Sequence, residues 1–320
     1  MIKLKRLFNS NLVLILIILA VELILLEIFM PNFISFRNFI TLCRQSSITA
    51  ILAIGMGIVL ISGGIDLSIG AIVAMLGMAA AKLITDFQIP ATAAGFIIII
   101  FGSLIGLLNG ALCARIRIHP FIITTALSVI YRGTANVFNN GRPVYGIPEN
   151  LLRFDKKTLL GIPYPLLILF ACILIASYIL RKTYLGKYIY AIGLDERTAE
   201  YSGINAGQIK MIVYSLSGFF YGIAAILLLS KVGSAQPTAT ISIELDLLAA
   251  AAIGGIGFRG GRGHILNIVI GVLIIEILGN TLIIFNVGEY YRYIFKGIVL
   301  LTALFMDGAL RQNRVKPSKI

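Results

Sequence analysis

The chain has 320 residues, of which 58% are apolar and 13% charged, and its mean hydropathy is +0.96. An average soluble domain carries about 25% charged residues, and a water-soluble fold of this size cannot hide so much apolar surface. Composition therefore excludes a soluble enzyme and a disordered protein, and it indicates an integral membrane protein. The net charge is +13, but the basic residues stand in small groups between apolar runs. That distribution favours membrane topology over nucleic-acid binding.

The apolar runs predict an all-α, polytopic membrane bundle of about ten transmembrane helices, with residues 1–320 forming one transmembrane domain. A hydrocarbon core of roughly 30 Å needs about 20 apolar residues per crossing. The expected spans are 11–30, 45–62, 66–86, 91–114, 119–139, 164–181, 210–231, 244–258, 264–286 and 291–310. Two of them, 45–62 and 244–258, are short or diluted by polar residues, which is typical of tilted, broken or partly re-entrant helices.

Both ends of the chain are expected on the cytoplasmic side. Met1–Ser10 is basic, and the run that follows it is too long for the core of a signal peptide, so we predict a retained first helix. An even number of spans returns the C-terminus to the same side. Arg115 and Arg117, Arg181-Lys182 and Arg259–Arg262 then follow helix ends on that side, as the positive-inside rule requires.

Two long connections carry most of the remaining polar sequence. Residues 139–164, predicted outside, are too polar to span and too rich in Pro and Gly for one helix. Residues 183–208, predicted inside, contain a compact polar stretch that starts at Asp195 and ends at Gly203. Acidic residues at the start and a glycine at the end predict a short surface helix there.

The segment from Gly63 to Ser68 is the most informative polar interruption. Gly63 and Gly64 favour a helix break, after which Asp66 or Ser68 can cap the next helix. Broken helices also line substrate cavities in transporters. These four residues are therefore candidates both for a helix break and for a translocation path.

Other spans contain polar and small residues at regular positions. The further path candidates, whose alternative role is hydrogen bonding between helices, are Asn109, Thr124 and Thr125. Glycines at positions 102, 106 and 110 share one helix face and predict close helix packing. The pairs Gly63-Gly64 and Gly254-Gly255 each lie near the inner end of a diluted span, which raises the question of an internal repeat.

Acidic residues inside spans leave ion coupling open. Glu276 is either a pathway acid or the partner of a donor on a neighbouring helix, and an ion-coupled secondary transporter would use Asp66 or Glu276. A membrane scaffold without transport is disfavoured by the polar interruptions. We predict no catalytic residue, cofactor site or metal site, because there is no phosphate-binding loop and the two His residues are far apart in the sequence.

A family resemblance rests on five segments that occur in order between about residues 50 and 300. They are Gly63-Gly64-Ile65-Asp66-Leu67-Ser68-Ile69-Gly70, Pro120–Thr125, Tyr131-Arg132-Gly133 with Asn140–Pro143, the 193–207 loop, and Ala252–Gly255 through Gly261–Gly263. Together they resemble the permease subunits of bacterial ABC importers for simple sugars, the ribose-type group of the ribose and branched-chain amino acid permease superfamily. The first segment is the most specific of the five.

The resemblance implies a subunit without an ATPase site that translocates ribose or a related monosaccharide across the inner membrane. It implies three partners besides lipid: a second permease subunit, a cytoplasmic ATPase with two nucleotide domains, and an extracytoplasmic sugar-binding protein. The surface helix would be the coupling helix that docks on the ATPase, with contacts from Asp195, Glu196, Arg197, Ala199, Glu200, Ser202 and Gly203. The usual Asn of the family's Gly-x-Asn-Glu stretch is Asp195 here, since Leu194-Asp195-Glu196 follows Gly193.

Overall fold

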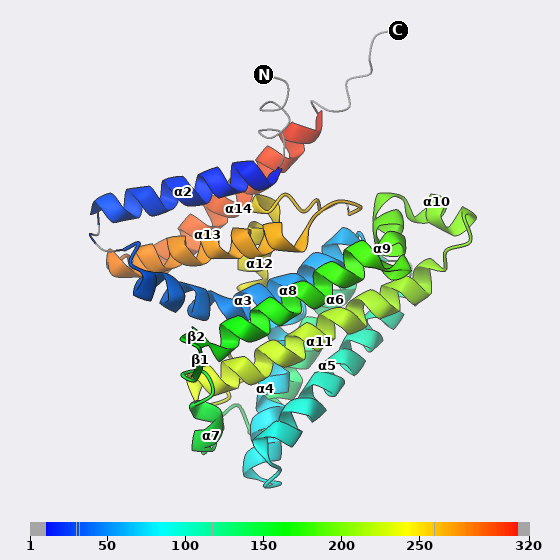
Figure 1. The fold of residues 1–320 in the computed structure, drawn as a ribbon. Helices are drawn as coiled ribbons and strands as arrows, with labels where there is room; N and C mark the ends of the chain where they lie inside the picture. The colour runs from blue at the N-terminus through cyan, green and yellow to red at the C-terminus, as the bar shows by residue number, and fades with distance from the viewer. Residues whose placement is uncertain (1–10, 30, 32, 117, 259, 313–320) are drawn as a thin grey trace.

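The computed structural model describes residues 11–29, 31, 33–116, 118–258 and 260–312, which form a bundle of helices with one small hairpin (Figure 1). The helices are α2 Asn11–Phe29, α3 Phe36–Ile61, α4 Ile69–Thr85, α5 Ala91–Arg115, α6 Pro120–Val137, α7 Glu149–Leu152, α8 Tyr164–Lys182, α9 Tyr184–Leu194, α10 Glu196–Tyr201, α11 Ala206–Val232, α12 Ile243–Ile253, α13 Ile265–Ile284 and α14 Glu289–Gln312. The predictions for Met1–Ser10, Arg117 and Arg259 lie outside the described residues.

Each predicted span overlaps one of these helices. Among the described residues, five helices are long and apolar enough to cross a membrane, namely α3, α5, α8, α11 and α13. The structure therefore agrees with an all-α membrane protein of several crossings. The count of ten and the side on which the termini lie stay predictions.

Helix α3 is longer than expected and lies at the centre of the bundle. The sequence predicted a short span over 45–62, but the helix already begins at Phe36. Ser35 caps it by accepting from the Asn38 amide at 3.4 Å, and the Asn38 side chain donates to the Phe33 carbonyl at 2.7 Å. Polar residues therefore occupy the first turns of α3, and a hydropathy pattern does not recognise these turns as part of a span.

Helix α12 is shorter than predicted and does not reach residue 258. It has 11 residues, or about 16 Å, roughly half of a hydrocarbon core. Two bonds close its end, Gly255 N to Ala252 O at 3.0 Å and Ile256 N to Ala251 O at 2.9 Å. The same Schellman pattern ends α3 at Gly63. The two glycine pairs thus share a local role as helix ends, whether or not the chain contains a repeat.

Helices α5 and α11 pack backbone against backbone, as the glycine series predicted. A Cβ added at Gly102 would lie 2.5 Å from the carbonyl oxygen of Gly218, and one at Gly106 would lie 2.0 Å from that of Tyr214. A Cβ at Gly110 would lie 2.6 Å from the Cα of Met211. Only glycine permits this approach, so the prediction of a packing face is confirmed.

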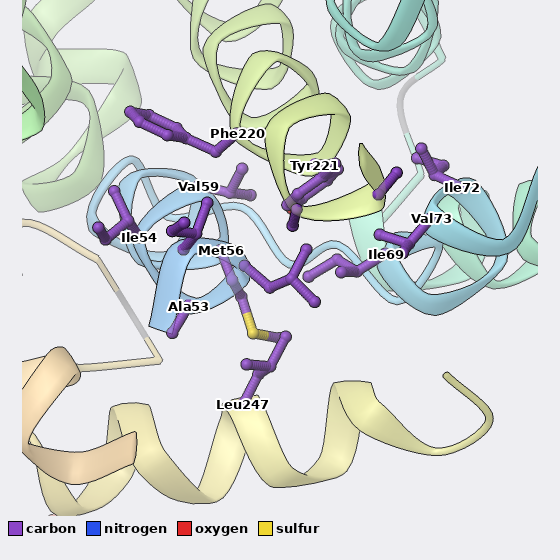
Figure 2. Packing of buried hydrophobic residues seen from close by; sticks show 14 of the residues in the cluster. Ala53, Ile54, Met56, Val59, Ile69, Ile72, Val73, Phe220, Tyr221 and Leu247 are labelled. Atoms are coloured by element: carbon purple, nitrogen blue, oxygen red, sulfur yellow. The ribbon is translucent and has the colours of Figure 1, made fainter. Parts of the chain in front are cut away.

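The apolar core lies where α3, α4, α11 and α12 meet (Figure 2). Met56 and Val59 of α3 lie between Tyr221 of α11 and Leu247 of α12, and all four side chains are fully buried. Ile69 of α4 enters the same cluster. The start of α4 is therefore seated inside the bundle rather than at its surface.

The two long connections lie at opposite ends of α8 and α11 (Figure 1). Residues 139–164 form α7 and a hairpin of β1 (Thr158–Leu159) with β2 (Ile162–Pro163), so the prediction that they are not one helix is confirmed. Residues 183–208 form two helices, α9 and α10, where a single surface helix was expected. We call these two ends of the bundle the α7 end and the α10 end.

Candidate functional site

The connection between α3 and α4 turns back into the bundle after a glycine. Gly63 adopts φ +84°, a left-handed conformation that favours glycine. Gly63 N donates to Leu60 O and Gly64 N to Val59 O, each at 3.0 Å, which closes the end of α3. Residues 62–68 are not helical, and α4 resumes at Ile69. The predicted helix break is therefore confirmed.

Side chains from two other helices satisfy the non-helical backbone of this break. Tyr214 of α11 and Thr124 of α6 both donate to the Ile65 carbonyl, each at 3.2 Å. The Leu67 amide donates to the Thr124 hydroxyl at 3.1 Å. Non-helical backbone inside a membrane protein is tolerated only where such partners satisfy its polar groups.

Asp66 is the centre of a buried polar network. Its side chain is buried, and its Oδ1 accepts from the Ser68 amide at 2.9 Å and the Ser68 hydroxyl at 2.5 Å. Tyr221 donates to Oδ2 at 3.3 Å. Asn109 of α5 donates to the Ser68 hydroxyl at 2.9 Å, and Tyr131 of α6 donates to the Asn109 carbonyl at 2.5 Å. The network joins the break to α5, α6 and α11.

The structure shows no side-chain cap at the start of α4, so the capping prediction is wrong for Ser68, and Asp66 acts on the turn before the helix instead. Ser68 occupies the N-cap position of α4, yet its side chain makes no cap bond. Its hydroxyl instead donates to Asp66 Oδ1 at 2.5 Å. Asp66 accepts the amide of Ser68 itself and so supports the turn that leads into the helix.

The structure brings together most of the proposed path residues and separates one. Asp66, Ser68 and Asn109 are buried in the Asp66 network, and Thr124 is buried against the backbone of the break, whereas Thr125 faces outward with its hydroxyl bonded to the Phe121 carbonyl at 2.7 Å. Sequence reasoning missed three tyrosines that bond to the break or to its network: Tyr131, Tyr214 and Tyr221. Their signal was a hydroxyl inside an apolar helix, since a buried tyrosine normally requires a hydrogen-bond partner.

Helix α10 forms an exposed, capped element at the α10 end. Asp195 Oδ1 accepts from the Thr198 amide at 2.7 Å, and this backbone bond holds the pKa of Asp195 below its usual range. The helix ends in another Schellman pattern, with Gly203 at φ +84°. Lys210 of α11 pairs with Glu196 at 2.5 Å and ties α10 to the bundle.

The predicted contact residues of α10 do not all face outward. Ala199 is buried, so it anchors the helix on the bundle. Asp195, Glu196, Arg197, Glu200, Ser202 and Gly203 are exposed. Tyr201 is 92% exposed and was absent from the prediction, although an aromatic residue inside a polar helix was the available signal. The exposed face therefore combines charges of both signs with one uncovered aromatic ring.

Glu276 has a donor on a neighbouring helix. The Thr49 hydroxyl of α3 donates to its Oε1 at 2.6 Å, which supports the second of the two roles considered for this acid. Beside it, a cavity of about 320 Å³ is lined by α3, α12, α13 and α14 and contains the ion pair of Lys296 with Asp246 at 2.7 Å. No cluster of three or more potential metal ligands occurs in the part of the chain that the structure describes.

In the part of the chain that the structure describes, five helices are long and apolar enough to span a membrane, a break lies inside the bundle and an exposed helix lies at one end. This is the architecture of a multi-pass membrane protein. A family model described as "Branched-chain amino acid transport system / permease component" matches residues 38–304. The chain belongs to this family of permease components. It is thus a multi-pass protein of the bacterial inner membrane.

Characterised relatives cover nearly the whole chain. The ribose import permease protein of Haemophilus influenzae is 36% identical over 303 residues, covering 93% of this chain and 94% of the relative. That of Escherichia coli is 38% identical over 296 residues, covering 91% and 92%. The D-allose transport system permease protein of Escherichia coli is 34% identical over 275 residues, covering 86% and 84%. No solved structure matches the chain.

Proposed function

We propose that the chain is the transmembrane subunit of an ATP-binding-cassette importer, which passes a monosaccharide across the membrane by alternating access. The observation that carries the proposal is the exposed, doubly capped helix α10 at one end of the bundle, in a chain whose relatives are named for ribose and D-allose. A separate ATPase with two nucleotide domains supplies the energy. A sugar-binding protein delivers the solute from the opposite side.

The ATPase is proposed to dock on the exposed face of α10. Arg197, Glu200 and Tyr201 point away from the bundle, while Ala199 and the Glu196–Lys210 pair keep the helix attached to it. Tyrosine and arginine are the residue types that dominate binding energy in protein interfaces. Asp195 contributes by fixing the first turn rather than by direct contact.

The α10 end is proposed to lie in the cytoplasm. Arg115, Arg181, Lys182 and Lys187 all lie at the ends of helices there, which supports this orientation through the positive-inside rule. The α7 end then faces the sugar-binding protein.

The solute path is proposed to run beside α6. This helix packs on α4 and α5 and leaves Thr125 and Gly133 exposed on its other side. A second permease subunit that faces this side would enclose a path lined by small and weakly polar groups. The break at Gly63 and Gly64 and its network then form the wall behind the path, and the specificity for one sugar lies mainly with the binding protein.

The test is uptake by proteoliposomes that contain the chain with its ATPase subunit and its sugar-binding protein. We expect radiolabelled ribose to accumulate only when ATP is present, and unlabelled D-allose and L-arabinose to rank the sugars by competition. Uphill uptake by the chain alone, driven by a proton or sodium gradient, would instead establish an ion-coupled secondary transporter.

A charge-reversal pair locates the docking face. Arg197→Glu with Glu200→Lys should abolish copurification of the ATPase, because both side chains are exposed on α10. The matched control is Arg153→Glu with Glu149→Lys, which reverses an exposed pair at the α7 end. Loss of the ATPase in both variants, or in neither, contradicts docking on α10.

A further inference from the structure

Three backbone segments meet at the α10 end with no side chain between them. The Gly261 amide, in the connection from α12 to α13, donates to the carbonyl of Ile61 at the end of α3 at 2.8 Å. A Cβ added at Gly193, near the end of α9, would lie 2.0 Å from the same carbonyl oxygen and 2.4 Å from Gly261 N. A Cβ at Gly260 would lie 2.6 Å from Gly63 N and 2.7 Å from Gly193 O. We call Gly63, Gly193, Gly260 and Gly261 the glycine junction.

Two side chains of α9 close the junction from outside. Tyr190 donates to the Gly263 carbonyl at 2.7 Å. Leu194 packs over Gly261, where a Cβ would lie 2.6 Å from Leu194 Cγ. Helix α9 is thus held to the connection between α12 and α13 by a hydrogen bond and an apolar contact, and to the end of α3 through Gly193.

The junction stands between the docking helix and the break. Gly193 precedes Asp195, the N-cap of α10, by two residues. Gly63 precedes Asp66, the centre of the buried network, by three residues. Helix α10 is also linked to the bundle by the buried side chain of Ala199 and by the pair of Glu196 with Lys210, and a pair with an exposed member contributes little.

We infer that the glycine junction is the positioning site that couples movement of α9 and α10 to the break between α3 and α4 and to the connection after α12. Backbones in direct contact have no side-chain rotamers to absorb a displacement, so a shift of α9 moves all three segments together. This inference deepens the proposed function and rests on it. It states that these four glycines transmit the movement of the docked ATPase from α10 to the membrane helices.

The test compares two glycines of the same helix. Gly193→Ala places a methyl group against Ile61 O, whereas Gly186→Ala places one 2.2 Å from Leu180 O at the end of α8, away from the break. The two changes create similar steric clashes. Gly193→Ala acts on the end of α3 and on the connection after α12, whereas Gly186→Ala acts on the end of α8. Tyr190→Phe is the milder third variant, because it removes the bond to Gly263 without adding volume.

The first measurement is the number of sugar molecules taken up per ATP hydrolysed by the reconstituted complex. We expect Gly193→Ala to lower this ratio about tenfold, in the usual range for coupling between sites, and Tyr190→Phe to lower it about threefold. Gly186→Ala should keep the wild-type ratio. The inference would be overturned if all three variants kept the wild-type ratio, or if Gly186→Ala lowered the ratio as much as Gly193→Ala does. If Gly193→Ala does not assemble, an unchanged ratio in Tyr190→Phe overturns it.

The second measurement separates this inference from the proposed function. Hydrogen exchange of the detergent-solubilised chain needs neither ATPase nor sugar. Exchange across residues 62–68 should rise in Gly193→Ala and Tyr190→Phe and stay at the wild-type level in Gly186→Ala. If wild type does not couple ATP to uptake, the proposed function fails, and the exchange pattern still decides whether the junction links α9 to the break.

Discussion

Asp66 and Asp195 each stand before a helix, in two different surroundings. Asp195 caps α10 by accepting the Thr198 amide at 2.7 Å, and Asp66 accepts the Ser68 amide at 2.9 Å in the turn that leads into α4. In each region a glycine at φ +84° ends a helix, Gly63 for α3 and Gly203 for α10. Asp66 is buried inside the bundle, whereas Asp195 is exposed at its end.

The difference shows what burial adds to a local motif. Water satisfies the remaining lone pairs of an exposed carboxylate, but a buried one needs protein donors. Asp66 obtains them from Ser68 and Tyr221, and Asn109 fixes Ser68 in turn. The break therefore depends on helices that are distant in sequence, while α10 depends mainly on its own residues.

The largest effect is expected from Asp66→Ala. The change leaves the Ser68 amide and the Tyr221 hydroxyl buried without their acceptor, so the free energy of unfolding should fall by about 3 kcal/mol. Denaturant unfolding in detergent measures this change. Asp195→Ala is the matched control and should cost far less, because water replaces the lost acceptor. Equal losses would break the comparison between the two aspartates.

The substitution Gly106→Ala should cause the next largest loss in the free energy of unfolding. Gly106→Ala pushes on Tyr214, whose hydroxyl holds Ile65, and overpacking of this kind costs about 2 kcal/mol. Gly133→Ala on α6 has open space around it and should be neutral or slightly stabilising. Thermal unfolding of both variants under one condition provides the measurement. A stable Gly106→Ala protein would show that α5 and α11 have freedom that the structure does not indicate.

Tyr221→Phe tests one bond of the network alone. It removes the hydroxyl that donates to Asp66 Oδ2 and leaves the aromatic packing in place (Figure 2). The expected loss is about 1 kcal/mol in the free energy of unfolding, since Asp66 keeps both bonds from Ser68. A loss as large as that of Asp66→Ala would mean that Tyr221, rather than Ser68, is the main partner.

The sequence predicted the elements whose cause is local. The glycine spacing at Gly102 and Gly106 indicated a packing face, and the pair at Gly63 indicated the end of a helix, because both follow from backbone sterics. The start of α10 at Asp195 likewise follows from the chemistry of an N-cap. None of these needs knowledge of what lies across the bundle.

Features set by distant contacts were not predictable. Tyr131 and Tyr221 belong to the network only because α6 and α11 pass beside the break, and no spacing in the sequence encodes that meeting. Residues 36–44 were too polar to be recognised as the start of α3. Ala199 was assigned to the docking face, yet which side of α10 is buried depends on where α11 lies.

The smallest effect expected is a pH dependence at Asp195. The Thr198 amide bonds to its carboxylate form and lowers its pKa from the ordinary value of 3.8. A lowered pKa in the folded state means that the cap is complete above 3.8 and is lost as the pH falls through the lowered value. The Thr198 amide proton shift, followed by NMR in nanodiscs, should titrate with that midpoint. Asp195→Asn should remove the titration and keep the helix, because asparagine caps without ionising. A midpoint above 3.8 would mean that the Asp195 carboxylate does not accept the Thr198 amide. Asp195 and Asp66 would then no longer be comparable as acceptors of a backbone amide.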